Sequence, residues 1–419
     1  MLDINFIRQN PEKVKKSIST KNINPKLVDD FLALDENWRE LVKNIDDLRS
    51  QQKKLSQEKN IEEAKKLKNK IQDLETDLKS VEKRREEILR LFPNLPLEEV
   101  PIGKNEKENV VVREVGKKPE FDFQPKDYLE LGQKLDLIDI ERAAKVSGSR
   151  FGYLKNQAAL LEFALIKLAF EKLISKKFIP IIPPVMVKSE MMKGMGYIDS
   201  EKDAEERYFL EKDGLYLVGT SEQSIGPMHA DEIFNEEELP KRYLAFSPCF
   251  RREAGSYGKD TKGILRVHQF DKLEMFSFCH PEKSKEEHEL FIETEEELMK
   301  ELGIPYRVVQ LCTGDLSQPS ASTIDIETWL AGQNNGQGEY RETHSASNTT
   351  DFQARRLNIK YRSSVRGQMS KVDFVHTVNG TAFAIGRMLI AIIENYQQKD
   401  GSILVPKVLQ NYLGIKEIK

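Results

Sequence analysis

The feature that most constrains this chain is a pair of apolar heptad seams near its N-terminus. The first seam alternates steps of four and three residues through Leu34, Trp38, Leu41, Ile45, Leu48 and Leu55. The second seam passes through Ala64, Leu67, Ile71, Leu74, Leu78, Val81 and Ile88. One straight helix would keep a single stripe, but the first seam, extended, leads to Lys59, Glu62 and Lys66. The pattern predicts two helices within residues 30–92 that turn near 57–61 and pack antiparallel as a coiled-coil arm.

The alternative is one long helix with a phase slip that dimerises in parallel, because the turn contains neither Gly nor Pro. Basic and acidic side chains alternate along the arm, which is typical of a solvated helix surface but also allows phosphate contacts. The second helix stops at Phe92-Pro93-Asn94-Leu95-Pro96, where two prolines prevent its continuation. We therefore expect an N-terminal domain at residues 1–104 and a second domain at residues 105–419. The second domain mixes strands and shorter helices and is expected to be α+β.

Composition excludes several classes of protein. No apolar run approaches the ~20 residues of a membrane helix, and the N-terminus has no secretory signal. We therefore expect a cytoplasmic protein with no membrane contact. The widely spaced cysteines Cys249, Cys279 and Cys312 predict neither a disulfide framework nor a zinc site. The net charge is −4 at pH 7, so any contact with nucleic acid must come from a local basic surface.

Residues 250–274 read as two strands joined by a polar, glycine-bearing loop. Arg251 and Glu253 share a parity on the first strand, and Phe270 and Glu274 share one on the second, so each pair is expected on one face. An arginine can bind a phosphate, a carboxylate can accept from an amine, and a phenyl ring can cover a base. The segment therefore suggests a nucleotide site with a loop that swings over the ligand. Structural cross-strand ion pairs would explain the same residues equally well.

Two other segments carry candidate ligands. Thr220 and Glu222 are expected at the end of an apolar strand and, two apart, to point the same way, although Thr-x-Glu is also common as a helix cap. Arg387 lies inside an apolar helix between Ala384 and Ala391. An arginine so placed needs either an anionic ligand or a buried carboxylate partner.

Between these segments, Glu342 and Ser345 offer the oxygen ligands that Mg²⁺ prefers. His344 is expected to be structural rather than a metal ligand. Gly258 and Gly263 have the spacing of a phosphate-binding loop, but Ile264-Leu265 follows in place of Lys-Ser/Thr. The standard nucleotide-binding motifs are therefore not matched.

In this order and spacing, the motifs resemble those of class II aminoacyl-tRNA synthetases, and in detail the bacterial-type seryl-tRNA synthetases. The resemblance runs from the N-terminus to the C-terminal segment. It rests on Met1-Leu2-Asp3 with Arg8-Gln9-Asn10-Pro11, on Pro183-Pro184 in motif 1, on residues 250–274 as motif 2, on residues 379–387 as motif 3, and on Gly219-Thr220-Ser221-Glu222 as the serine-contacting Thr-x-Glu.

The resemblance implies an α+β fold with an antiparallel sheet of about six to seven strands flanked by helices, and a homodimer formed through motif 1. It implies an ATP-dependent ligase that joins L-serine to the 3′ end of tRNA(Ser), held by the N-terminal arm, and also of tRNA(Sec). The implied ATP-binding residues are Arg251, Arg252, Glu253, Phe270, Glu342, Thr343, His344, Ser345 and Arg387. The implied serine-binding residues are Thr220, Ser221, Glu222, Glu274 and Thr381. Arg251 and Arg387 would be catalytic, and Glu342 and Ser345 would hold Mg²⁺ with ATP.

The sequence departs from the family in places, and two rival functions remain. Glu342 is followed by Thr343-His344-Ser345-Ala346-Ser347-Asn348 where the family commonly has Ser-Ser-Cys-Ser-Asn, and Thr381 replaces a common serine. One rival is a homologue that aminoacylates carrier proteins, which would be expected to lack the arm and to use Cys/His zinc ligands. The other is a catalytically inactive coiled-coil scaffold, which would be expected to lack the arginines and glutamates named above.

Overall fold

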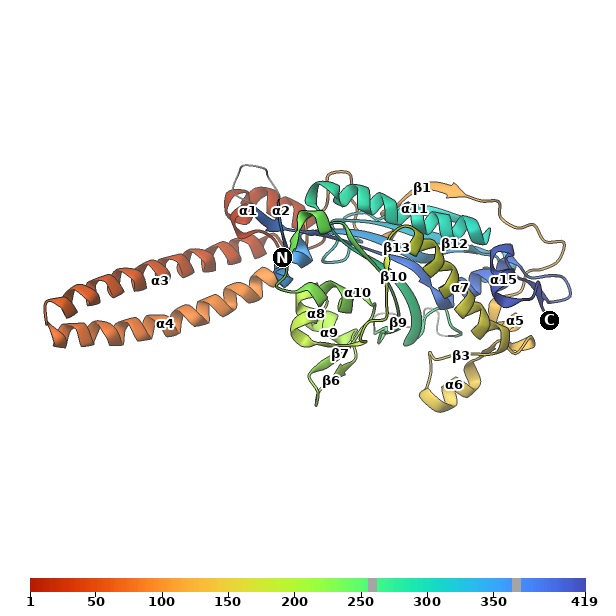
Figure 1. Cartoon of the computed structure of the whole chain (residues 1–419), viewed down its shortest axis with the longest axis horizontal. Helices are drawn as coiled ribbons and strands as arrows, with labels where there is room; N and C mark the ends of the chain where they lie inside the picture. The colour runs from red at the N-terminus through yellow and green to blue at the C-terminus, as the bar shows by residue number, and fades with distance from the viewer. Residues whose placement is uncertain (255–261, 364–370) are drawn as a thin grey trace. The chain divides into compact units, whose positions relative to one another are not determined.

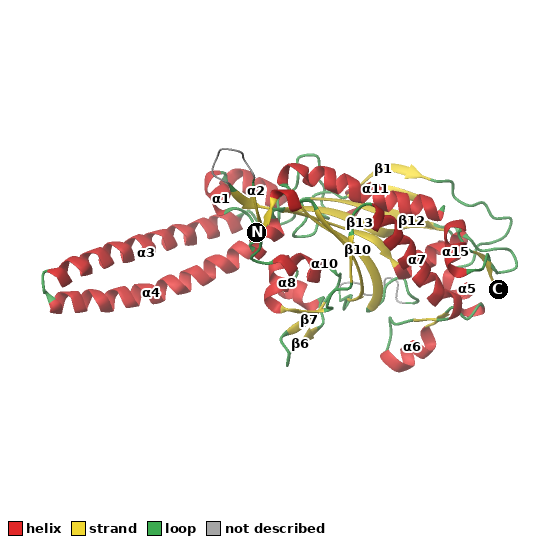
Figure 2. Ribbon diagram, in the orientation of Figure 1, coloured by secondary structure: helices red, strands yellow, loops and turns green. Residues whose placement is uncertain are grey.

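The structure is a computed structural model, and it describes residues 1–254, 262–363 and 371–419 (Figures 1 and 2). The glycine-bearing loop expected to swing over a ligand, with Gly258, lies largely outside the described residues. The chain divides into two compact units, Met1–Leu95 and Pro96–Lys419.

All secondary-structure elements of the first unit are helices. Two short helices, α1 (Ile4–Gln9) and α2 (Pro11–Thr20), precede the long helices α3 (Lys26–Gln57) and α4 (Ile61–Arg90). The long helices run antiparallel as a hairpin (Figure 1). The chain turns without glycine because Lys59 adopts a left-handed conformation, with φ 60°. The predicted coiled-coil arm is confirmed, and the continuous helix is not formed.

A small core closes the base of this hairpin. Its buried residues are Leu2, Ile7, Val14, Ile18, Val28, Phe31, Leu89 and Phe92. Next to it lies Asp35, a fully buried acid that the heptad pattern did not reveal. Arg8 donates to both oxygens of Asp35 from Nε and Nη2, each at 2.8 Å, and Arg85 Nε donates to Oδ1 at 2.8 Å. Asp35 therefore ties α1, α3 and α4 together.

We expect Asp35→Asn to destabilise the first unit by about 3 kcal/mol, because breaking a buried ion pair leaves its partners uncompensated. Burial raises the pKa of Asp35, but the hydrogen bonds from Arg8 and Arg85 outweigh burial and lower it. A lowered pKa adds stability above the ordinary aspartate pKa of about 3.9. That contribution is lost as the pH falls through the lowered value.

Urea unfolding followed by Trp38 fluorescence measures this effect, in a Trp329→Phe background because the chain has two tryptophans. Asp46→Asn is the matched control, since Asp46 forms a 3.7 Å ion pair with Arg49 in which both side chains are mostly exposed. We expect the control to cost less than about 1 kcal/mol. Equal costs for the two variants would contradict the role given to Asp35.

An eight-stranded sheet forms the centre of the second unit. Its strands, in spatial order, are β1 (Val110–Val115), β11 (Tyr306–Gln310), β12 (Ser322–Leu330), β13 (Glu339–Thr350), β16 (His376–Ala384), β10 (Gln269–Cys279), β9 (Lys241–Phe250) and β4 (Ile179–Ile181). Neighbours are antiparallel except β4 and β9, which are parallel. A parallel pair needs a long crossover, and residues 182–240 supply it. The α+β prediction is confirmed, with more strands than the resemblance implied and one parallel edge pair.

Three long helices pack on this sheet, namely α7 (Asn156–Ser175), α11 (Ser284–Leu302) and α14 (Ile385–Asn395). Their apolar residues share one large core with the sheet. On β10, Leu273 and Met275 belong to this core, whereas Phe270, Lys272 and Glu274 line a cavity. The alternation of side chains along a strand thus gives β10 a core side and a cavity side.

The crossover between β4 and β9 folds into its own small layer. It contains the three-stranded sheet of β5 (Met186–Lys188), β7 (Leu215–Leu217) and β6 (Phe209–Leu210), and the helices α8 (Ser189–Met195), α9 (Glu201–Glu205) and α10 (Glu222–Ile225). Thr220 and Glu222 are not at the end of a strand as expected. Instead, β7 ends at Leu217, Thr220 lies in a bend, and Glu222 begins α10.

The remaining elements surround the sheet. They are α5 (Tyr128–Lys134), β2 (Ile138–Asp139), α6 (Ile140–Ser147), β3 (Tyr153–Leu154), β8 (Ile233–Asn235), α12 (Gln333–Gly336), α13 (Phe352–Leu357), β14 (Lys360–Arg362), β15 (Val372–Phe374), β17 (Ile403–Leu404), α15 (Gln410–Leu413) and β18 (Glu417–Ile418). Among the described residues, none of the helices is both long and apolar enough to cross a membrane.

Candidate active site

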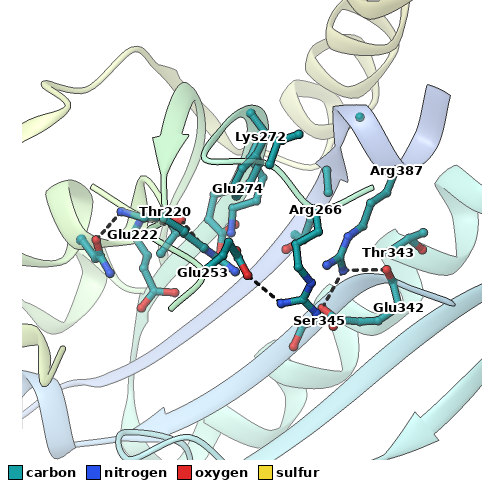
Figure 3. A pocket seen from close by; sticks show the side chains of 18 of the residues that line it. Thr220, Glu222, Glu253, Arg266, Lys272, Glu274, Glu342, Thr343, Ser345 and Arg387 are labelled. Atoms are coloured by element: carbon teal, nitrogen blue, oxygen red, sulfur yellow. Dashed lines mark hydrogen bonds and ion pairs between the residues drawn. The ribbon is translucent and has the colours of Figure 1, made fainter. Parts of the chain in front are cut away.

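A cavity of about 260 Å³ lies on the second unit between the sheet and the crossover layer. Eleven predicted site residues line it: Thr220, Glu222, Arg251, Glu253, Phe270, Glu274, Glu342, Thr343, Ser345, Thr381 and Arg387. They come from α10 and the loop before it, from the segment after β9, from β10, β13 and β16, and from the start of α14. Figure 3 shows most of these side chains directed into one space. Segments that are far apart in the sequence therefore converge here.

Arg251 and Phe270 are neighbours at one end of the cavity. Arg251 follows the last residue of β9, and its guanidinium carbon lies 5.3 Å from the centre of the Phe270 ring. Arg251 Nε donates to the carbonyl oxygen of Gly219 at 3.1 Å. Within the described parts of the chain no hydrogen bond engages the other guanidinium nitrogens, which can bind an anion beside an aromatic surface.

Glu253 is held in an uncommon backbone conformation, with φ 52°. It does not continue β9 as expected, because the strand ends at Phe250. Its carboxylate accepts a hydrogen bond from Arg266 Nη1 at 2.6 Å (Figure 3). Arg266 was missed in the sequence, because nothing in the pattern links it to Glu253 across the loop.

Arg387 and Glu342 lie on another side of the same space. Arg387 Nη1 donates to the Glu342 carbonyl oxygen at 2.7 Å and is 3.4 Å from its carboxylate Oε1 (Figure 3). Half of the Glu342 side chain is exposed (50%). Removal from bulk water alone would raise the pKa of Glu342, but Arg387 and Arg251 outweigh that effect and lower it. Glu342 is therefore an ionised carboxylate that faces the cavity.

A second group of acids lies beside Thr220. Glu222 is 4% exposed, and the Tyr197 hydroxyl donates to its Oε1 at 2.5 Å. Burial, and then Glu274, raise the pKa of Glu222 to about 7. Glu274 is 2% exposed and forms an ion pair with Lys272. The pair of buried carboxylates with limited compensation is suited to a small cation such as an ammonium group.

Three predicted residues do not line the cavity. Ser221 is fully buried. Arg252 places its guanidinium carbon 4.9 Å from the Tyr208 ring centre. His344 is 1% exposed and packs against Phe383, and burial lowers its pKa to about 3, so its ring is neutral.

A break in strand register explains the position of His344. The pairing of β12 with β13 shifts between Ile326 and Glu327. Glu342, Thr343, Ser345 and Ser347 line the cavity, while His344 and Ala346 turn to the core. Simple alternation from Glu342 would have put His344 on the cavity side.

Several cavity residues were not predicted: Tyr197, Arg207, Gln223, Arg266, Lys272, Ser317, Ser347 and Asn379. Strand parity could have found two of them, because side chains two residues apart share a face. Lys272 lies two residues from both Phe270 and Glu274, and Asn379 lies two residues before Thr381. Tyr197 and Arg207 come from the crossover layer, and their approach depends on tertiary packing.

Comparisons with known proteins show the family of this chain. The model of the class II tRNA synthetase core domain (G, H, P, S and T) matches residues 208–396. The model of the seryl-tRNA synthetase N-terminal domain matches residues 1–96. The chain is 46% identical to a serine–tRNA ligase of Dictyoglomus turgidum, over 100% of this chain and 99% of that one. A serine–tRNA ligase of Thermodesulfovibrio yellowstonii is 43% identical, with both chains fully covered.

Solved structures give the same result. A seryl-tRNA synthetase from Pyrococcus horikoshii complexed with ATP superposes with a TM-score of 0.93 and 42% identity, over 100% of this chain and 99% of that one. A cytoplasmic serine–tRNA ligase from Naegleria fowleri in complex with AMP gives 0.91 and 37%, over the same shares. The fold of the second unit is that of a class II aminoacyl-tRNA synthetase. Within that class, this chain belongs to the seryl-tRNA synthetase family, and the resemblance seen in the sequence is confirmed.

Proposed function

We infer that this chain is a serine–tRNA ligase. It activates L-serine with ATP to seryl-adenylate and transfers the seryl group to the 3′ end of tRNA(Ser). The observation that carries this conclusion is the full-length identity of 46% to a serine–tRNA ligase, in a chain whose cavity holds arginines and buried carboxylates together. Both the arm and the charged cavity residues are present, which removes the support for the two rival functions.

We propose that Arg251 and Arg387 bind the phosphates of ATP and that Phe270 and Glu253 hold its adenine. The contact of Arg251 with the Phe270 ring supports this arrangement, because it puts a cation where a nucleotide would pass from base to phosphate. Glu253 would have to exchange its bond with Arg266 for one with the adenine amine, or use its second oxygen. Thr343 contributes to the same wall.

We propose that serine binds between α10 and β10. Glu222 and Glu274 would meet its ammonium group, and Thr220 and Thr381 would meet its hydroxyl. A site that pairs a substrate hydroxyl rejects the analogue without one, because its buried polar groups are left unmatched. Alanine would be rejected in this way, and threonine by size.

We propose Glu342 and Ser345 as the protein ligands of a Mg²⁺ ion that enters with ATP. Both offer oxygen atoms to the cavity, and the ionised state of Glu342 suits a hard cation. Among the described residues there is no group of three or more metal-binding acids, histidines and cysteines. Phosphate oxygens would therefore complete the coordination, as is usual for Mg²⁺. The ion would supply charge neutralisation at the phosphates.

The first step needs no nucleophile from the protein. An oxygen of the serine carboxylate attacks the α-phosphorus, and the bond from that phosphorus to pyrophosphate breaks. The protein's part is to align the two substrates and to stabilise charge on the phosphates. A ribose hydroxyl at the tRNA 3′ end then attacks the seryl-adenylate carbonyl carbon, the bond from that carbon to the phosphate oxygen of AMP breaks, and AMP leaves as the hydroxyl gives up its proton to solvent.

Serine-dependent ATP–pyrophosphate exchange tests the activity, followed by charging of tRNA(Ser). We expect exchange with serine and little with threonine or alanine. Exchange that depends on another amino acid, or on none, would contradict the proposed function.

The raised pKa of Glu222 predicts a pH dependence for serine binding. The serine ammonium is bound by the ionised carboxylate, and this form is lost as the pH falls through about 7. The KM for serine should therefore rise by about tenfold per pH unit on the acid side of that pKa. Exchange kinetics between about pH 6 and 8 measure it, with the KM for ATP as the internal control. A flat serine profile would show that Glu222 does not titrate in this range.

We also propose the partners of the chain. The long arm of α3 and α4 would bind tRNA(Ser), and tRNA(Sec) where the cell has one. A homodimer would form through α7 and the following segment, which expose the apolar side chains Leu160, Phe163, Ile174, Ile179, Ile182 and Met186. A cytoplasmic location is proposed because the tRNA substrates are used there. The division of labour would follow the predicted domains, residues 1–104 for tRNA and residues 105–419 for catalysis.

A further inference from the structure

Arg207 is a cavity arginine to which no role has yet been given. It lies between α9 and β6 and lines the cavity with Gly219, Thr220 and Glu222. Its Nε is buried, and in the described part of the chain this nitrogen has no hydrogen-bond partner. Asp203 and Glu206 act on it electrostatically, but no carboxylate of the described residues forms an ion pair with it. Placing a guanidinium in a cavity without a bound anion is unfavourable for stability, because no ion pair compensates for its desolvation.

Arg251 makes this position still less favourable. Arg251 Nε donates to the carbonyl oxygen of Gly219 at 3.1 Å, and Arg207 Nη1 lies 3.2 Å from the point that a Cβ on Gly219 would occupy. The two guanidiniums thus flank one residue. Burial, and then Arg251, lower the pKa of Arg207. Two cations so placed indicate an anion between them when the site is filled.

A purely structural role accounts for only part of this arrangement. The guanidinium carbon of Arg207 lies 5.4 Å from the Tyr197 ring centre, and Tyr197 donates its hydroxyl hydrogen to Glu222. An aromatic face stabilises a positive charge, but this contact leaves the Nε–H without an acceptor. The contact does place Arg207 next to Tyr197, which binds Glu222 of the proposed serine site.

We propose that Arg207 binds the carboxylate of serine, opposite Arg251. The inference rests on the proposed function and adds a residue to the amino-acid site. Serine carries its ammonium and its carboxylate on the same carbon. If Glu222 holds the ammonium, the carboxylate falls within the reach of a neighbouring cation, and Arg207 is that neighbour. Arg251 and Arg387 are proposed to bind the phosphates of ATP, and Arg266 pairs with Glu253, so the charge of Arg207 is left for the second substrate.

This position fits the chemistry of activation. The serine carboxylate and the α-phosphate are both anions, so they must be brought together against their repulsion. A guanidinium on the carboxylate side lowers that repulsion and orients one carboxylate oxygen toward phosphorus. That oxygen forms the new bond, pyrophosphate leaves, and the other oxygen becomes the carbonyl of the seryl-adenylate.

The test measures binding by calorimetry for two proteins and two ligands. The proteins are the full-length chain and its Arg207→Gln variant, and the ligands are serine and serinamide, which has the same ammonium and hydroxyl but no carboxylate. We expect Arg207→Gln to weaken the binding of serine by about 10- to 100-fold, because the variant loses a hydrogen bond between two charged groups. Serinamide should bind both proteins within about twofold. Arg207→Lys should recover part of the lost affinity, because lysine keeps the positive charge but cannot bind a carboxylate with two parallel hydrogen bonds.

Arg142→Gln is the matched control, since Arg142 is an exposed arginine outside the cavity that pairs with Asp139. This variant should bind serine and serinamide with the same affinity as the unmodified chain. If Arg207→Gln weakened the binding of serine and serinamide equally, the proposal would be overturned. Arg207 would then be a residue that only positions Tyr197 and Glu222. Unchanged serine binding, or a loss confined to ATP, would overturn the proposal as well. Pyrophosphate exchange by the unmodified chain tests the proposed function separately, because the calorimetric comparison does not depend on turnover.

Discussion

Arg251→Ala should reduce serine-dependent ATP–pyrophosphate exchange by about 100- to 1,000-fold, the usual cost of removing one preorganised charge-stabilising group. The structure indicates that the effect will be chemical rather than structural. Arg251 lies beyond the end of β9, and the hydrogen bond that its side chain makes to Gly219 is the part that replacement removes. The measurement is exchange at saturating serine, with circular dichroism to confirm that the fold is kept.

Two further variants sharpen this result. Arg251→Lys keeps the charge but loses the two-pronged geometry, so it should recover only part of the rate. Arg142→Ala removes an exposed arginine from the same unit and should leave exchange unchanged. Near-normal exchange in Arg251→Ala would remove this residue from the proposed phosphate site.

Shortening the arm should abolish tRNA charging while leaving serine activation intact. The ion pairs Asp35–Arg85 and Arg49–Glu75 fix which levels of α3 and α4 face each other. Residues 43–77 can therefore be replaced by a short glycine-containing turn, with both helices cut at one level. We expect exchange within about twofold of normal. Charging of tRNA(Ser) should fall by about 100-fold or more, because RNA is recognised largely through extended shape and backbone contacts.

The level of this cut matters. Removal of residues 30–92 would also delete Phe31 and Phe92, which are fully buried in the core at the base of the hairpin. Loss of charging would then report unfolding of the first unit. With the base kept, helical content and the Trp38 environment serve as controls. Unimpaired charging by the shortened chain would contradict the role proposed for the arm.

Much of this architecture follows from periodicity. The two seams predicted the hairpin because coiled-coil packing depends on short-range spacing, and the side chains of β10 alternate as a strand requires. The burial of Asp35 could not be predicted, because Arg8 and Arg85, which donate to it at 2.8 Å, lie on other helices. For the same reason Tyr197 and Arg207 were missed, since only the folded crossover brings them to Glu222. His344 was assigned to the cavity on the strength of its neighbours, but the register break on β13 turns it inward.

The central position of β10 has a consequence for how this enzyme could change its amino-acid preference. Because β10 is paired on both sides, to β9 and β16, sliding it by one residue would send Phe270, Lys272 and Glu274 into the apolar interior together. On this strand Phe270 is proposed to hold adenine and Glu274 to hold serine, so the pairing of β10 would position parts of both substrate sites. The crossover layer supplies Tyr197, Arg207 and Glu222 to the proposed serine site, so substitutions of its side chains can alter substrate choice while the register of β10 is kept.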